Sequence, residues 1–489
     1  MTLLTARSLP TVGRSIAVPS YDRSQVRVGI VHLGVGGFHR SHEAMYLDRL
    51  MVEGSALDWG ICGVGILPAD QRMQELMAAQ DCLYTLVVKH PDGGLDARVV
   101  GSIVEYLFAP DDPDAVVEKM AAGQTRIVSL TVTEGGYNAS AVTGEFDGTH
   151  PGVVADLQPG AVLSTSFGLV TEALARRRQR GLLPFTVVSC DNIPGNGDLA
   201  RRSFAAFAAL RDPELGEWVA ASVPFPNSMV DRITPVTTDD DRAELAERFG
   251  VEDAWPVVCE PWTQWVMEDS FACGRPPLED AGVQLVDDVA PYELMKLRLL
   301  NAGHQVLAQP GRLAGFTYVH EASGDALFRA FLGCYLDEEA TPTLAPVPGI
   351  DLGSYKAGLL DRFASPAIGD TLARICAEAS DRIPRFLLPV LRANLASGGP
   401  IDAAVTVLAA WARSAEGTDD EGRPIELVDA RAEELAAAAR RQDPLAFIAD
   451  RGLFGDLVDD ARFAATYRTA LESLRTRGTR ATLEAAVRG

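Results

Sequence analysis

The stretch that decides the fold is "VRVGIVHLGVGGFHRSH" at residues 26–42. Its first half is rich in β-branched residues, which is typical of a buried strand. Gly34, Gly36 and Gly37 follow, and apolar residues at helical spacing continue over residues 40–54. A strand, a glycine-rich turn and a helix predict dinucleotide binding, because glycines let a pyrophosphate approach the backbone and a helix N-terminus attracts it.

The glycine turn alone is a weak signal, because His39 occupies the third glycine position of the GxGxxG pattern, and a plain turn is the alternative. His39 and His42 also form an HxxH pair, but no cysteine or acidic group accompanies them at a recognisable spacing, so we expect no metal site. The residues predicted to line the phosphate loop are Gly34, Val35, Gly36, Gly37, Phe38, His39 and Arg40.

An acidic residue follows the second predicted strand, "WGICGVG" at residues 59–65. Asp70 lies there, further along than the spacing of about 20 residues that is usual for a ribose-binding acid. Its charge would repel a 2′-phosphate, which favours NAD over NADP. The alternative interpretation is a turn aspartate after Pro68.

Further strands are predicted at residues 83–90, 97–108, 125–136 and 185–192, with helical patterns between them. This alternation predicts a mostly parallel sheet. From about residue 285 onward, long helical patterns dominate. We therefore predict an α/β Rossmann-type, dinucleotide-binding domain over residues 1–285 and a mainly α-helical substrate-binding and catalytic domain over residues 286–489.

The formal net charge of −23 disfavours nucleic acid and anionic membranes as partners. Seven scattered cysteines without a CxxC pair predict reduced thiols in a cytoplasmic protein. No apolar run reaches the roughly 18 residues of a membrane-spanning helix. These features leave a small molecule as the expected partner.

Polar residues end several of the apolar runs. Asp191 and Asn192 follow one strand, and Asp231 lies between two prolines in "PNSMVDRITP". Ligands of an open α/β sheet bind beyond the carboxyl ends of its strands, so Asn192 and Asp231 are either substrate contacts or turn residues, whereas Asp191 is interpreted as a turn cap. Glu134, before Gly135 in "TVTEGGY", either gates the site or belongs to a turn.

The stretch "YELMKLRLLNAGH" at residues 292–304 combines an amphipathic helix with Lys296, Asn301 and His304. On a regular α-helix, Asn301 and His304 lie about 140° and 80° round from Lys296. A buried lysine can act as a general base, and an asparagine can stabilise an alkoxide. A snorkelling lysine on a structural helix is the alternative.

Five motifs resemble, in order, those of the polyol-specific long-chain dehydrogenases and reductases: "GIVHLGVGGFHRSH", "TVTEGGY", "SCDNIPGNG", "PNSMVDRITP" and "KLRLLNAGH". The resemblance covers nearly the whole chain. It implies a monomeric, metal-independent, NAD-dependent enzyme with its active site between two domains. The catalytic residues that it implies are Lys296 as general base or acid, Asn192 and Asn301 as oxyanion ligands, and His304 as the residue that positions the hydroxyl; near the substrate it implies Asp231, Arg374 and Arg382.

The resulting hypothesis is reversible oxidation of a linear polyol at a secondary alcohol, with D-mannitol and D-fructose as the expected pair. D-arabinitol or sorbitol oxidation and reduction of a hexuronate such as fructuronate are alternatives within the family, and Arg374 or Arg382 could bind a carboxylate. The family often has lysine where this chain has Arg382, which leaves fine substrate preference open. A lysine Schiff-base enzyme and a non-catalytic NAD sensor are the alternatives from other classes.

Overall fold

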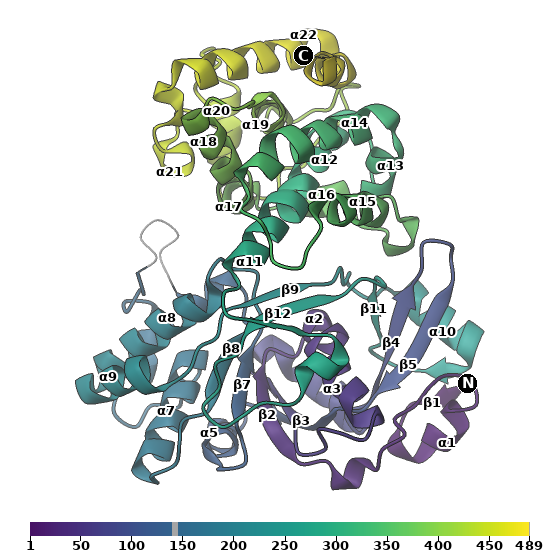
Figure 1. Cartoon of the computed structure of the whole chain (residues 1–489), viewed down its shortest axis with the longest axis vertical. Coiled ribbons are helices and arrows are strands. Elements are labelled where there is room, and N and C mark those ends of the chain that lie inside the picture. Colours follow the sequence, from purple (N-terminus) through teal and green to yellow (C-terminus); the bar gives the residue numbers. More distant parts are fainter. Residues whose placement is uncertain (139–144, 489) are drawn as a thin grey trace. The chain divides into compact units, whose positions relative to one another are not determined.

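The computed structural model describes residues 1–138 and 145–488 of the chain. The chain divides into two compact units, Met1–Ala290 and Pro291–Gly489. The first contains the sheets and the second is helical (Figure 1), which confirms the predicted α/β Rossmann-type part and mainly helical part. The assignment of dinucleotide binding to residues 1–285, and of substrate binding and catalysis to residues 286–489, stays a prediction. None of the helices in the described part of the chain has the length and apolarity needed to cross a bilayer.

The main sheet of the first unit has five parallel strands in the order β6-β3-β2-β7-β8. Their bounds are β2 (Val28–Leu33), β3 (Gly60–Gly65), β6 (Ile103–Phe108), β7 (Ile127–Leu130) and β8 (Thr186–Ser189). From β2 the chain first adds β3 and β6 on one side and then returns to add β7 and β8 on the other. The strand order therefore reverses between β2 and β7, beside the carboxyl end of β2. In sheets of this kind ligands bind at that position.

Helices cover both faces of this sheet. Val31 and Leu33 of β2 pack into a core with α5, α7 and α8, whereas Ile30 packs into a second core with α3, as the alternation of side chains along a strand requires. The helical elements of the first unit are α1 (Leu9–Val12), α2 (Gly37–Ser41), α3 (Glu43–Val52), α4 (Gln71–Ala79), α5 (Pro113–Ala121), α6 (Pro151–Asp156), α7 (Ser166–Gln179), α8 (Asn196–Arg211), α9 (Pro213–Ser222), α10 (Asp239–Phe249) and the short η1 (Ala6–Ser8), η2 (Arg23–Gln25), η3 (Pro68–Asp70), η4 (Glu134–Tyr137) and η5 (Leu278–Ala281).

Three smaller sheets complete the first unit. They are β5-β4-β11, β13-β12-β9 and β1-β10, formed by β1 (Thr2–Leu3), β4 (Tyr84–Lys89), β5 (Leu95–Val100), β9 (Ser228–Asp231), β10 (Val251–Glu252), β11 (Val257–Cys259), β12 (Gln264–Glu268) and β13 (Gln284–Val286). The single strand expected at residues 97–108 is wrong: β5 and β6 belong to different sheets. The chain bends between them because Gly101 N–H donates to Asp48 (2.9 Å) and the Ser102 hydroxyl donates to the Ala44 carbonyl (2.6 Å).

The helix expected over residues 40–54 is broken at His42, which has φ −121° and ψ −95°. The His42 ring is buried against Phe38, Tyr46 and Trp265, and its Nε2 atom lies 3.1 Å from the Gln264 carbonyl oxygen. Burial lowers the pKa of His42 to about 4. This histidine is therefore a neutral packing residue at a helix break.

The second unit is built around α19, whose residues are almost all buried and which packs against α12 and α22. Segments η6 and η7 are π-helical: η6 lies between α11 and α12, whereas η7 continues α14 and leads into the short turn η8. The elements are α11 (Ala290–Lys296), η6 (Leu297–Asn301), α12 (Ala302–Leu313), α13 (Val319–Gly324), α14 (Ala326–Cys334), η7 (Tyr335–Ala340), η8 (Thr341–Thr343), α15 (Leu352–Phe363), η9 (Pro366–Ile368), α16 (Leu372–Cys376), α17 (Ala379–Phe386), α18 (Leu388–Ser397), α19 (Asp402–Ala415), α20 (Ala432–Ala439), α21 (Arg451–Phe454), η10 (Leu457–Asp459) and α22 (Ala461–Arg488).

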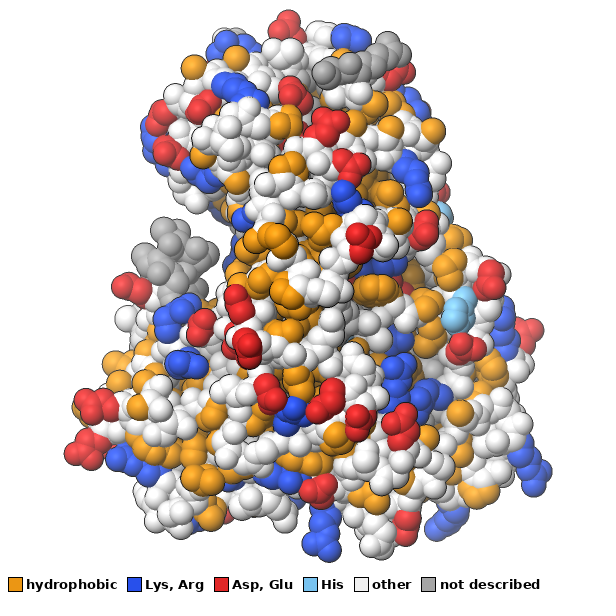
Figure 2. All heavy atoms as spheres, in the orientation of Figure 1, with side chains coloured by type: hydrophobic (Ala, Val, Ile, Leu, Met, Phe, Trp, Pro, Cys, Tyr) orange, Lys and Arg blue, Asp and Glu red, His pale blue; other side chains and the backbone are white. Residues whose placement is uncertain are grey.

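Acidic and basic side chains are interspersed on the face drawn in Figure 2, with no large patch of one sign. Many of them are paired, for example Arg176 with Asp114 and Glu172 on the first unit. Exposed pairs of this kind contribute little stability each. The net negative charge is thus spread over the surface instead of forming one binding face on the side drawn.

Glu339 on η7 is a buried carboxyl that closes the start of α19. Its two oxygens accept the N–H groups of Ala403 (2.6 Å) and Ala404 (2.9 Å). Burial raises the pKa of Glu339 to about 7, and the nearby charges of Asp402 and Glu338 raise it further, against the effect of the two N–H donors. Ionisation of this group is therefore less favourable in the folded than in the unfolded protein.

We predict that Glu339 makes stability fall as pH rises from about 4.5 to about 7, because only the unfolded state ionises freely in that window. The difference in unfolding free energy, Glu339→Gln minus wild type, should increase by about 2–3 kcal/mol between those limits. Urea unfolding at several pH values measures it. Asp351→Asn is the control. Backbone and side-chain hydrogen bonds from Ser354 lower the pKa of Asp351, so this substitution should change the pH dependence of stability only at acid pH. A difference for Glu339→Gln that does not change with pH would contradict the prediction.

Candidate functional site

The glycine turn after β2 has two glycines with different roles. Gly34 has φ +94°, and a Cβ atom there would collide with the Thr131 carbonyl group. A Cβ atom at Gly36 would meet only the Gly34 carbonyl oxygen, 4.0 Å away. Gly34 thus brings the chain against β7, whereas Gly36 borders open space at the N-terminal end of α2. That space can accept a phosphate group next to backbone N–H donors.

The side chains of His39 and Arg40, predicted to line this loop, are only 1% exposed and lie behind it. Arg40 Nε donates to the Gly36 carbonyl (3.3 Å) and Nη1 donates to the Trp255 carbonyl (2.5 Å). His39 stacks on His32, with 3.4 Å between the ring centroids. Both side chains are therefore buried supports of the loop.

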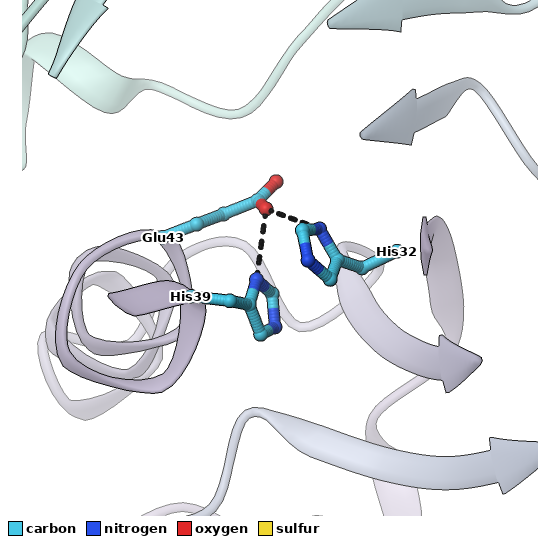
Figure 3. A group of neighbouring side chains, drawn as sticks. All are labelled: His32, His39 and Glu43. Carbon is cyan, nitrogen blue, oxygen red and sulfur yellow. Dashed lines mark ion pairs between the residues drawn. The ribbon is translucent and has the colours of Figure 1, made fainter. Parts of the chain in front are cut away.

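His32, His39 and Glu43 form a buried group whose donor atoms lie within 4.8 Å of one another (Figure 3). Glu43 Oε2 is 3.1 Å from His32 Nδ1 and 3.2 Å from His39 Nδ1. Two histidines and a glutamate are ligands that zinc accepts. However, the two rings are stacked with only 17° between their planes. A metal ion about 2 Å from both nitrogens cannot lie in both ring planes, so this arrangement does not suit a metal.

Asp70 lies after β3, as predicted, and its carboxylate is partly occupied. Oδ2 accepts the N–H groups of Ile66 and Leu67, each at 2.9 Å. The residue is half-buried. Asp70 therefore does act as a turn aspartate. The turn that it closes is also the one in which a ribose hydroxyl is expected, so the two interpretations are compatible.

The carboxyl ends of β7 and β8 are joined by Asp191. Its carboxylate accepts the N–H of Thr133 (2.9 Å), the N–H of Val132 (3.2 Å) and the hydroxyl of Tyr137 (2.7 Å). Asp191 is thus a structural residue, as expected, and holds Thr133 at the unusual φ of +63°. Asn192, the next residue, is exposed at the end of β8.

The predicted role of Glu134 concerns a side chain that lies outside the described part of the structure, although its backbone belongs to η4.

Asp231 is the last residue of β9. It is buried, and its Oδ2 accepts the indole N–H of Trp262 at 3.0 Å. Trp262 is partly exposed. Its contact with Asp231 could not be predicted, because nothing in the stretch "PWTQW" places this tryptophan beside Asp231.

Lys296 and Asn301 of the second unit are separated by a π-helical segment. Lys296 is the last residue of α11 and is 4% exposed. Asn301 ends η6, and its Oδ1 atom is buried without a hydrogen-bond partner. The predicted 140° between them assumed a regular α-helix. In a π-helix the backbone bonds run from i to i+5, so residues five apart lie on nearly the same side, and the predicted angle is wrong for this segment.

The remaining predicted residues of the second unit surround α12. His304 packs its ring against Phe363, with 4.3 Å between centroids. Helix α12 packs against α16 and α17, which carry Arg374 and Arg382. Arg374 donates to both carboxylate oxygens of Asp370 through Nε and Nη2, and Arg382 Nη1 donates to the carbonyls of Arg374 (3.0 Å) and Ile375 (3.1 Å). The structure thus brings these residues to neighbouring helices.

Comparison with known proteins gives full-length matches. Residues 28–280 match the mannitol dehydrogenase Rossmann domain family, and residues 288–475 match the mannitol dehydrogenase C-terminal domain family. The chain is 46% identical to a mannitol 2-dehydrogenase of Aspergillus fumigatus, with 98% of each chain covered. A similar mannitol 2-dehydrogenase from Pyricularia oryzae is 45% identical over 98% of each chain.

Two solved structures are also similar. The first is the Pseudomonas fluorescens mannitol 2-dehydrogenase ternary complex with NAD and D-mannitol, with 42% identity, a TM-score of 0.92 and full coverage of both chains. The second is a D-sorbitol dehydrogenase in substrate-free form, with 36% identity, a TM-score of 0.89 and coverage of 98% of this chain and 100% of that one.

An added methyl group should affect stability at Gly34 but cofactor binding at Gly36. Gly34→Ala should lower the free energy of unfolding by about 1–3 kcal/mol, because alanine disfavours the positive φ and its Cβ meets the Thr131 carbonyl. Gly36→Ala should change it by less than about 0.5 kcal/mol yet weaken dinucleotide binding, because the methyl group occupies the open space. Urea unfolding and cofactor titration measure the two effects. Equal stability losses in both variants would contradict this.

Proposed function

The chain belongs to the mannitol dehydrogenase family, and from that premise we propose that it catalyses the reversible NAD-dependent oxidation of a linear polyol at a secondary alcohol, D-mannitol to D-fructose. The observation that carries the proposal is the full-length similarity to a structure solved with NAD and D-mannitol. The chain itself has Lys296, Asn301 and His304 on the helical segment after the Rossmann-type unit.

The first unit has the features that NAD requires. The open space at Gly36 suits the pyrophosphate, and the turn closed by Asp70 suits the adenosine ribose. When bound, NAD supplies the acceptor for the hydride that leaves the alcohol carbon. We propose that Asp70 also excludes a 2′-phosphate by charge repulsion, so that NAD is preferred over NADP.

Lys296 is proposed to take the hydroxyl proton as the carbon–hydrogen bond breaks. Lys296 is 4% exposed, and a lysine amine held next to the reacting hydroxyl can serve as a general base. Asn301 and Asn192 are proposed to donate amide N–H bonds to the oxygen as negative charge develops there. Such bonds lower the barrier because they are stronger to an alkoxide than to an alcohol. His304 is proposed to orient the hydroxyl.

The surroundings of the two arginines favour a neutral polyol over a hexuronate. Arg374 already has a bidentate carboxylate partner in Asp370, and Arg382 donates to two backbone carbonyls. A sugar carboxylate would have to displace these partners. Asp231, with Trp262 as its hydrogen-bond donor, supplies an acceptor for a polyol hydroxyl. We therefore propose that these residues contact hydroxyl groups, while a monomeric state and a cytoplasmic location stay predictions.

A substrate panel tests the proposed activity. With NAD, the purified chain should oxidise D-mannitol with a higher kcat/KM than D-sorbitol, D-arabinitol or D-mannonate, and NADP should be the poorer cofactor because Asp70 repels its phosphate. Nicotinamide absorbance measures the rates. D-mannonate as the best substrate would favour the hexuronate alternative. Substrate trapping on lysine by borohydride would indicate Schiff-base chemistry, and NADH binding without any turnover would indicate a sensor.

Lys296→Ala should lower kcat for D-mannitol by about 10²–10⁴-fold, the usual contribution of a general base, while NADH still binds. Steady-state rates and NADH fluorescence titration measure the two properties. Lys356→Ala is the matched control, because Lys356 is a lysine of the same unit that pairs with Asp337. Near-normal turnover of Lys296→Ala, or equal losses in both variants, would exclude Lys296 as the proton-transfer group.

A further inference from the structure

The buried group below the glycine turn has a hydrogen-bond pattern that determines its protonation. His32 Nε2 lies 2.9 Å from Thr131 Oγ1 and 3.2 Å from the Gly34 carbonyl oxygen. The Thr131 hydroxyl donates its one proton to that same carbonyl at 2.5 Å. Both neighbours of Nε2 are therefore acceptors, so Nε2 must carry a proton.

The other ring nitrogen has the same kind of surroundings. His32 Nδ1 lies 2.8 Å from Ser129 Oγ and 3.1 Å from Glu43 Oε2. The Ser129 hydroxyl donates to Glu43 Oε2 at 2.9 Å, which uses its single proton. A bare Nδ1 would then face two acceptors, one of them a buried carboxylate. A proton on Nδ1 removes that repulsion.

Charge balance supports the same assignment. Burial opposes ionisation of Glu43, but hydrogen bonds from His32 and His39 outweigh it and hold the pKa of this carboxyl below its usual range. Burial also lowers the pKa of His39 to about 3, so that ring is neutral. A neutral ring stacked at 3.4 Å on a cationic one is a favourable contact. Within the buried group, His32 is the residue left to balance the charge of Glu43.

We infer that His32 is an imidazolium ion paired with Glu43, and that this buried pair is a positioning device that holds the Gly34 carbonyl and thereby shapes the loop for a dinucleotide phosphate. The carbonyl of a trans peptide and the N–H of the next residue point in opposite directions. Holding the Gly34 carbonyl toward His32 therefore aims the Val35 N–H away from the buried pair. The choice of ligand rests on the proposed function.

The protonation is tested on the full chain without cofactor. In protein with ¹⁵N-labelled histidine, both ring nitrogens of His32 should have the chemical shifts of protonated nitrogens at neutral pH. In Glu43→Gln, which removes the counter-charge, one of them should shift to the value of a bare nitrogen. The His32→Phe/Glu43→Gln double variant assigns the signal by its loss. A bare nitrogen on His32 in the wild type would overturn the inference.

The positioning role is tested by binding. The double variant removes both charges together, which avoids a lone buried carboxylate. It should bind NADH about tenfold more weakly because the loop is no longer preorganised, while kcat at saturating NAD and KM for D-mannitol stay within about twofold. Unchanged NADH affinity would overturn the role.

Asp156→Asn is the matched control for lost stability. Asp156 is a buried carboxyl of the same unit that accepts the N–H groups of Ser164 and Thr165, and its replacement should leave NADH affinity unchanged. An equal loss of affinity in this variant would count against a specific role of the pair. Failure of the wild type to bind NADH would refute the proposed function, while the histidine shifts would still decide the ion pair.

Discussion

The close contact between the backbone of Gly34 and the Thr131 carbonyl is the constraint on which the first unit depends. Gly34 N–H donates to Val64 of β3, and Thr131 N–H donates to Leu33, both at 3.0 Å. The chain therefore leaves β2 while still bonded to the strands on both sides. Glycine has no side chain to collide with the Thr131 carbonyl, so the turn can be tight. Helix α2 therefore begins directly at the carboxyl edge of the sheet, where this fold class binds ligands.

Polar residues near this edge divide into buried ones that bond to the backbone and exposed ones. Asp191 and Asn196 satisfy backbone groups of neighbouring segments; Asn196 Nδ2, for example, donates to the Ser228 carbonyl at 2.8 Å. Arg40 does the same for the glycine turn. Asn192 follows Asp191 directly and is exposed. Adjacent polar residues of one motif thus serve different purposes, and their hydrogen-bond partners separate them.

The second unit uses a backbone irregularity where the first uses glycine. A regular α-helix would carry Lys296 and Asn301 on different sides, and a π-helical segment changes that spacing. Such segments are less regular than α-helices and occur often at functional sites. Segment η6 packs against the second π-helical segment, η7, and against α17, so tertiary packing stabilises the irregular turn. Its proposed consequence is a lysine and an amide that act on the same oxygen.

The sequence by itself determined the strand–glycine–helix unit, the change to a helical second part and the family, because side-chain periodicity, glycine and ordered motifs are local properties. Only the tertiary structure decided that residues 97–108 belong to two sheets, that His42 is a packing residue and that Asp70 closes its own turn. It also decided that His32, to which the sequence assigned no role, lies 3.1 Å from Glu43 and that both residues contact Ser129. Hydrogen bonds between distant residues depend on how the elements pack, and periodicity carries no record of that packing.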